Sequence, residues 1–176
     1  MANISDAFGT ITIWVGATEP KEQQRLTNNF KKIFDEVMSG KTACYYTDIS
    51  SWTIDKDDDG NGIVGVGDFN GCGRWAFEAN CRYTYDWLKQ GVENRPELKK
   101  LLDEINKYNW KISYEFADEE AGCEVLYEMN CDIDHRAGED KAYQSIRYEE
   151  DFDYNAQNLV NLGFFDTLEE AEEYVS

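Results

Sequence analysis

The segment Trp110-Lys-Ile-Ser-Tyr-Glu-Phe116 alternates apolar and polar side chains. A second alternating run extends from Cys123 to Ile133, and the acidic segment Asp118-Glu-Glu-Ala-Gly122 separates the two. Successive side chains of a strand point to opposite faces, so each run has one apolar face and one polar face. The pattern predicts an antiparallel hairpin that packs its apolar face into a core, with Cys123 and Cys131 both on the inner side.

Segments on either side of this hairpin predict the elements that cover it. Apolar residues recur at helical spacing from Glu19 to Met38 and again from Pro96 to about Asn109, which predicts two amphipathic helices. Thr10 to Val15 alternates as a half-buried strand does. The run 43–54 and the run Ile63 to Phe69 are joined by an acidic, glycine-bearing turn, so they predict another hairpin.

The C-terminal part of the chain predicts two further elements. A last strand is expected from Ala142 to Tyr148, and Thr167 with Glu170 forms a capping box for a short C-terminal helix. The order of elements predicts one α+β domain over residues 1–176, with a ferredoxin-like antiparallel sheet. We expect two main helices on one face of that sheet, with an extra hairpin or strand beside it.

Residues 74–130 resemble the YubB-type ferredoxin-like domain of phage and plasmid proteins. The residues that carry the resemblance are Trp75, Phe77 and Glu78, the helix from Pro96, Trp110-Lys-Ile-Ser-Tyr-Glu-Phe116, Glu119-Glu-Ala-Gly122 and Val125-Leu-Tyr-Glu128. The chain departs from that pattern in an insertion from Tyr83 to Asn94 and in its acidic tail. The resemblance implies a fold and a mobile-element setting, and it transfers no catalytic residue.

Charge excludes several classes of function. The 176 residues include 36 acidic and 17 basic side chains, for a formal net charge of −19. Such a chain repels nucleic acid and anionic membranes and attracts basic proteins or cations. No apolar run approaches the ~20 residues that cross a bilayer. The five cysteines form no Cys-x-x-Cys pair and no signal peptide is evident, so we expect reduced thiols and a cytoplasmic location in the host cell.

The negative charge is concentrated in the C-terminal third, residues 111–176, which holds 19 acidic and 4 basic residues and so contributes −15 of the total. On a strand, side chains two apart stand ~6.6 to 6.8 Å from each other, about two base-pair rises of a duplex. We therefore expect a partner-binding surface of acidic contacts and aromatic anchors. Its residues are Glu115, Glu119, Glu120, Glu124, Glu128, Asp132, Tyr148, Glu149, Glu150, Asp151, Phe152, Asp153 and Tyr154.

The functional hypothesis is a non-enzymatic acidic decoy that binds the basic nucleic-acid-binding surface of a partner protein. Its most concrete form is an anti-defence protein of a phage or mobile element, such as an anti-CRISPR or anti-restriction inhibitor. No cofactor is implied, and neither direct nucleic-acid binding nor membrane binding is expected. The alternative is a small accessory protein whose acidic face only maintains solubility.

A Ca²⁺-responsive module is a further alternative, because Asp55, Asp57 and Asp59 match the start of a calcium loop. The match then fails, since Val66 stands at the twelfth position, where a bidentate Glu is required. A polar hairpin turn is the competing interpretation and the favoured one.

Two other motifs lack the context that their chemistry needs. The glycine-rich run Gly65 to Gly71 has the wrong spacing for a phosphate loop and is followed by no lysine, so we interpret it as strand glycines near a bulge. His135, the one histidine, has no candidate nucleophile with it and is expected in an exposed turn. Neither motif supports an enzyme.

Overall fold

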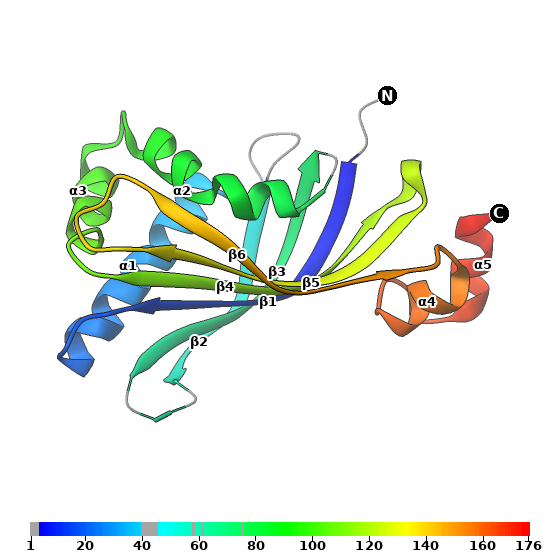
Figure 1. The fold of residues 1–176 in the computed structure, drawn as a ribbon, viewed down its shortest axis with the longest axis horizontal. Coiled ribbons are helices and arrows are strands. Elements are labelled where there is room, and N and C mark those ends of the chain that lie inside the picture. Colours follow the sequence, from blue (N-terminus) through cyan, green and yellow to red (C-terminus); the bar gives the residue numbers. More distant parts are fainter. Residues whose placement is uncertain (1–3, 40–45, 58, 61, 75) are drawn as a thin grey trace.

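The computed structural model describes residues 4–39, 46–57, 59–60, 62–74 and 76–176. Strands and helices within these ranges account for most of the chain (Figure 1). The strands are β1 (Ile4–Val15), β2 (Tyr46–Lys56), β3 (Ile63–Arg74), β4 (Trp110–Glu120), β5 (Val125–His135) and β6 (Ala142–Phe152). The helices are α1 (Pro20–Val37), α2 (Glu78–Val92), α3 (Pro96–Ile105), α4 (Ala156–Asn161) and α5 (Leu168–Val175).

The six strands form one open sheet in the order β2-β3-β1-β4-β5-β6, and every neighbouring pair is antiparallel. β1, the first strand of the chain, therefore lies in the interior of the sheet between β3 and β4. The α+β class and both predicted hairpins, β2–β3 and β4–β5, are confirmed. The ferredoxin-like assignment stays a prediction.

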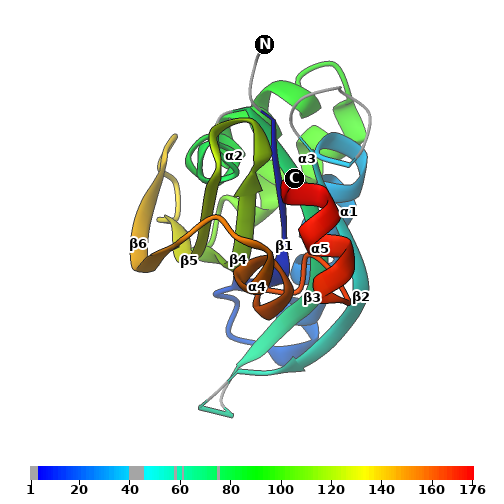
Figure 2. The same cartoon turned by 90° about the vertical axis from the view of Figure 1, so that its right-hand side faces the viewer.

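The two faces of the sheet differ in what covers them. Helices α1, α2 and α3 lie on one face, which we call the helix-covered face. The opposite face, the open face, has helices only at one end, where α4 and α5 follow β6 (Figure 1). Figure 2, viewed from that end, shows β6 and β2 at the two margins of the sheet. The open face is therefore the larger accessible surface.

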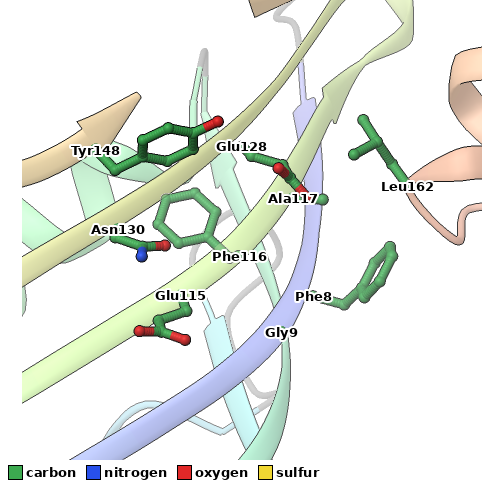
Figure 3. A pocket seen from close by; sticks show the side chains of 9 residues that line it. All are labelled: Phe8, Gly9, Glu115, Phe116, Ala117, Glu128, Asn130, Tyr148 and Leu162. Carbon is green, nitrogen blue, oxygen red and sulfur yellow. The ribbon is translucent and has the colours of Figure 1, made fainter. Parts of the chain in front are cut away.

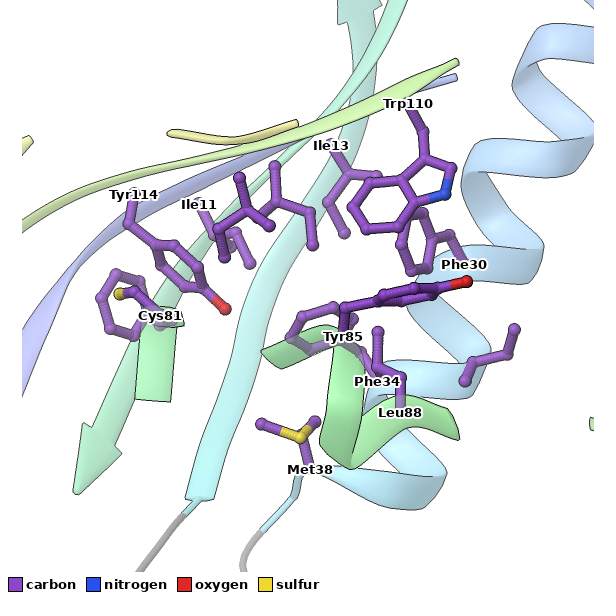
Figure 4. Packing of buried hydrophobic residues seen from close by; sticks show 14 of the residues in the cluster. Ile11, Ile13, Phe30, Phe34, Met38, Cys81, Tyr85, Leu88, Trp110 and Tyr114 are labelled. Carbon is purple, nitrogen blue, oxygen red and sulfur yellow. The ribbon is translucent and has the colours of Figure 1, made fainter. Parts of the chain in front are cut away.

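The main core lies between the helix-covered face and the helices (Figure 4). Ile11 and Ile13 of β1 point into it and have no exposed surface. Phe30 of α1 packs edge-to-face against Trp110 of β4, with ring centroids 5.0 Å apart. Burying one such side chain contributes about 1.5–3 kcal/mol to stability, so the alternation of β1 and β4 and the apolar stripe of α1 together specify this layer.

Glycines in β3 make room for aromatic rings. A Cβ on Gly65 would lie 2.1 Å from the Trp52 ring, and one on Gly71 would lie 2.2 Å from the Phe77 ring. The β2–β3 register shifts between Ser50 and Thr53. The interpretation of this run as strand glycines near a bulge is confirmed, since the glycines lie in β3 beside this register shift.

Helix α2 was not predicted. Its buried residues Cys81, Tyr85, Leu88 and Val92 recur at helical spacing. The interleaved Tyr83 and Trp87 have high strand propensity, and the helix has no proline at its first turn. The segment interpreted as an insertion thus supplies the third helix of the covering layer.

Two residues lie where the sequence patterns did not predict them. His135 ends β5 on the helix-covered face, is 1% exposed and stacks on Trp110 with ring centroids 4.8 Å apart. The prediction of an exposed turn histidine is therefore wrong. Cys123 is exposed in the 3₁₀ turn Ala121–Cys123 that joins β4 to β5, so of these two cysteines Cys131 alone is in the core.

Other differences concern the bounds of the elements. β4 and β6 run four residues beyond the predicted Phe116 and Tyr148, α3 ends at Ile105, and α4 was not predicted. The capping box is confirmed, because the Thr167 hydroxyl accepts a hydrogen bond from the Glu170 N–H. Trp75, Cys44 and the rest of 43–45 lie outside the described residues.

No helix in the described ranges has the length and apolar character needed to cross a membrane.

Candidate functional site

Strand register brings the acidic residues of β4, β5 and β6 together on the open face. Glu115 of β4 lies opposite Asn130 of β5, which lies opposite Tyr148 of β6. In the next row, Glu128 of β5 lies opposite Glu150 of β6. Directly opposed side chains share a face and stand ~4.5–5.5 Å apart at Cβ. Three carboxylates and a tyrosine therefore occupy adjoining positions.

A pocket of about 530 Å³ lies at this place, between the open face and the end of α4 (Figure 3). We call it the Glu128 pocket. Its lining residues are Phe8, Gly9, Glu115, Phe116, Ala117, Glu128, Asn130, Tyr148 and Leu162. Figure 3 shows Leu162 reaching toward the sheet from the helical segment, with Phe8 below it. The pocket thus combines carboxylates with apolar and aromatic walls.

Phe8 is held in place by the segment that follows α4. Its ring packs edge-to-face on Phe164, with centroids 4.9 Å apart, and Gly163 approaches the same ring. Gly163 has φ +88°, a conformation that glycine adopts without strain. The turn after α4 therefore fixes one wall of the pocket.

The carboxylates of the open face are not equally neutralised. Glu115 has one cationic neighbour, the Arg147 guanidinium at 3.7 Å. Among the described residues, Glu128 and Glu150 form no ion pair with a basic side chain. The Tyr148 hydroxyl donates a hydrogen bond to Glu150, and this bond raises the pKa of Tyr148. The uncompensated carboxylates here are thus Glu128, which lines the pocket, and Glu150, which lies opposite it in the sheet.

Asp132 was predicted as an exposed contact, and this expectation is wrong. Its side chain is on the open face but the residue is only 5% exposed. Arg147 Nε lies 3.0 Å from one oxygen and Lys111 Nζ 3.1 Å from the other, and the Ser113 hydroxyl donates at 2.7 Å. Internal cations therefore compensate this charge.

Glu119 is also buried, at 6% exposed, and the Tyr154 hydroxyl donates a 2.6 Å hydrogen bond to it. Burial, and then the bond to Glu119, raises the pKa of Tyr154. Phe152 packs against a second apolar cluster formed by Leu126, Ala156, Leu159 and Ala171. Tyr154, Phe152 and Glu119, predicted as partner contacts, therefore attach α4 and α5 to the sheet.

Glu120 points to the helix-covered face. It stands two residues after the buried Asp118 in β4, and side chains two apart on a strand share a face. Burial raises the pKa of Asp118 to about 6. Burial and the adjacent Asp118 charge raise the pKa of Glu120 to about 6 as well, and the residue is 8% exposed. Glu120 is therefore separated from the open-face acids and is not an exposed contact.

The remaining predicted residues are exposed but do not share one face. Glu124 lies in the turn between β4 and β5 with φ +56°. Glu149 and Asp151 lie opposite Met129 and Tyr127, which are part of the main core, so they are on the helix-covered side of β6. Asp153 follows β6 and is exposed. We call Glu149, Glu150 and Asp151 the β6 triplet; it presents carboxylates on both sides of one strand.

The calcium-loop residues form a turn between β2 and β3. The Asp57 N–H donates to the Gly62 carbonyl at 3.1 Å, and the Gly60 N–H donates to the Asp57 carbonyl at 2.8 Å. Asp55 and Asp59 are exposed, while Asp58 and Asn61 lie outside the described residues. No three His, Cys, Asp or Glu side chains in the described part of the chain are grouped to hold a metal ion.

Sequence reasoning identified Tyr148 but missed the other non-acidic residues of the pocket. Asn130 stands between Glu128 and Asp132 in the outward row of β5, so alternation already assigned its face. Phe8 has the same parity as Thr10 and Thr12 in β1 and was overlooked because the predicted strand began too late. Leu162 had no local signal, since it reaches the pocket only through the turn after α4.

Comparison of the chain with models of protein families, with curated proteins and with solved structures finds no match.

Proposed function

We propose that this protein is a non-enzymatic acidic inhibitor that binds the basic nucleic-acid-binding surface of a partner protein. The observation that carries the proposal is the adjacency of Glu128 and Glu150 on the accessible open face, with no cationic partner among the described residues. Uncompensated carboxylates at one place give a local negative potential that attracts cations and accelerates association with a basic protein.

The Glu128 pocket suits a cationic side chain. Carboxylates accept charge-assisted hydrogen bonds from a guanidinium or ammonium group, and aromatic faces such as those of Phe8 and Tyr148 attract cations as well. Lysine and arginine side chains line the grooves that hold nucleic-acid phosphates. A protein that occupies such a groove through its own carboxylates excludes the nucleic acid.

The setting we propose is anti-defence: a phage or mobile-element protein that prevents a CRISPR or restriction nuclease from loading DNA. Burial excludes Glu119, Glu120 and Asp132 from the proposed contact, and Phe152 and Tyr154 pack against α4 and α5 instead. Glu124 is exposed but lies apart, in the turn between β4 and β5. The proposed contact is therefore Glu115, Glu128, Tyr148, the β6 triplet and Asp153. These residues belong to β4, β5, β6 and the segment that follows β6. Their negative charge is therefore concentrated at one margin of the sheet.

The decisive experiment is competition with DNA. A labelled duplex is bound to purified CRISPR and restriction nucleases, and its fluorescence anisotropy is followed as the protein is added. We expect displacement that weakens steeply with salt, since ion release drives binding to such surfaces. A pull-down from host lysate, with and without added duplex, identifies the partner if the nuclease panel does not contain it.

Charge-reversal variants locate the contact. Glu128→Lys with Glu150→Lys reverses the two open-face carboxylates that carry the proposal, and it should weaken displacement and flatten its salt dependence. The matched control is Glu172→Lys with Glu173→Lys on α5, which makes the same change in net charge at exposed positions outside the proposed contact. Equal displacement by both double variants and the unaltered protein would contradict the proposal.

A further inference from the structure

The outer edge of β6 is an unused pairing surface. β6 is the last strand of the sheet order and pairs only with β5 in the described chain. Figure 2 shows it at the margin of the sheet. An edge strand presents a row of N–H and C=O groups that can pair with another chain. At 11 residues, β6 is long enough to hold a full additional strand.

Side chains along β6 are unusually exposed for apolar residues. Tyr143 is 54% exposed, Ile146 47% and Tyr148 43%. Tyr143 and Tyr148 are on the open face, while Ile146 lies opposite Cys131 on the other side. A neighbouring strand would contact all three, because cross-strand pairs form on both faces of a sheet.

The charge of β6 specifies which kind of chain fits. The β6 triplet places Glu150 on the open face and Glu149 and Asp151 on the helix-covered side, so any strand beside it meets carboxylates on both faces. Arg147, the one cation within β6, already pairs with Asp132. A second copy of this chain brings the same triplet and a net charge of −19, so charge disfavours self-pairing.

We propose that β6 accepts an extended segment of a basic protein as a seventh strand. Three consecutive Lys or Arg residues lie beside the β6 triplet, and alternate apolar residues lie beside Tyr148 and Tyr143 on the open face. Backbone hydrogen bonds supply affinity and the alternating side chains supply selectivity, as in other strand-addition complexes. The inference rests on the proposed function, for which it names the form of the partner and the mode of binding.

The test uses two synthetic peptides with the full-length protein. The first is Lys-Arg-Lys-Val-Thr-Val-Thr-Val; the control has proline in place of each valine, which keeps the charge but removes alternate backbone donors. Binding is measured by calorimetry, and amide hydrogen exchange along β6 by NMR. We expect the first peptide to bind about tenfold more tightly than the control, the factor that corresponds to one or two net hydrogen bonds.

The pattern of protection separates strand addition from charge attraction. Strand pairing should slow exchange at every second amide between Tyr143 and Asp151, because alternate N–H groups point to the outer edge. Equal affinity of the two peptides without alternating protection would overturn the seventh-strand proposal while leaving the acidic-surface function intact. Binding by neither peptide would also overturn it, and the DNA competition experiment would then decide the proposed function separately.

Two further results complete the test. A variant with Glu149→Gln, Glu150→Gln and Asp151→Asn should weaken both peptides, since it removes charge and keeps the edge. Sedimentation of the peptide-free protein should give a monomer. A dimer with alternating amide protection along β6 would assign the edge to a second copy and overturn the proposal.

Discussion

The backbone N–H of Phe77 donates a 2.7 Å hydrogen bond to the buried carboxylate of Asp118. Asp118 lies near the end of β4, and Phe77 immediately precedes α2, so this bond joins the sheet to the start of the helix. The Tyr127 hydroxyl of β5 also donates to Asp118. A negative group at a helix N-terminus satisfies otherwise unpaired donors and interacts favourably with the helix dipole.

Stability should respond to pH through Asp118. Its pKa is raised from 3.8 to about 6 in the folded protein, because burial disfavours the charged form. Between these values the folded state binds the proton more tightly than the unfolded state. The contribution of Asp118 to the free energy of unfolding therefore falls as pH rises from about 4 to about 6, by at most about 3 kcal/mol.

Urea unfolding of Asp118→Asn measures this effect. The deficit in stability relative to the unaltered protein should be larger near pH ~4 than near pH ~7. Asp153→Asn, at an exposed position, is the control and should change the free energy of unfolding little. A pH-independent deficit for Asp118→Asn would contradict the assignment. The pKa of Glu120 should also fall in this variant, since Asp118 is one cause of its elevation.

Loss of Arg147 should destabilise the sheet through Asp132. Arg147→Ala leaves the nearly buried carboxylate with Lys111 as its remaining cation, and we expect a loss of about 1–2 kcal/mol. The double variant Arg147→Ala with Asp132→Asn should lower the urea midpoint by less than the sum of the two single decreases. Arg136→Ala, an exposed arginine with no ion pair to described residues, should change the midpoint little. Strict additivity would show that the pair does not interact.

Tyr154→Phe should loosen the C-terminal helices. The substitution removes the donor to Glu119 and leaves a buried carboxylate oxygen without that partner, at a cost of about 1–3 kcal/mol. Tyr148→Phe removes a hydroxyl that also donates to a glutamate, but at an exposed site, so its cost should be much smaller. Thermal unfolding compares the two. Equal shifts in Tm would mean that burial of Glu119 does not matter.

Gly71→Ala should be strongly destabilising. The added methyl group would lie 2.2 Å from the Phe77 ring, so the ring or the strand must move, at a cost of about 1–3 kcal/mol. Phe77→Leu in the Gly71→Ala background should recover part of the loss, because the smaller side chain vacates that space. A double variant less stable than Gly71→Ala alone would show that the clash is not the cause.

Much of the fold was predictable because its signals are local. Alternation in β1, β4 and β5 and the apolar stripe of α1 each appear within one segment. Helix α2 was not predicted because its tyrosines and tryptophan have high strand propensity. Packing of the segment on β3 and β5 is what stabilises it as a helix. Propensity yields to tertiary context in such cases.

For the candidate site, the sequence predicted which acidic residues point outward but not which of them are buried or paired with cations. Sequence assigned Glu115 and Glu128 to the outward face, and the structure agrees. It could not assign Asp132 to an ion-pair network, because Arg147 meets it only through the β5–β6 register shift. The burial of Glu119 likewise depends on Tyr154 returning to cover it after β6.

The second apolar cluster, around Leu126 and Leu159, is separate from the main core. Small clusters of this kind open at a lower free energy than the global unfolding transition. We therefore expect α4 and α5 to detach as a unit while the six-stranded sheet stays intact. Because Leu162 forms one wall of the Glu128 pocket, each such opening would widen the pocket, and native-state hydrogen exchange would detect it first in residues 156–175.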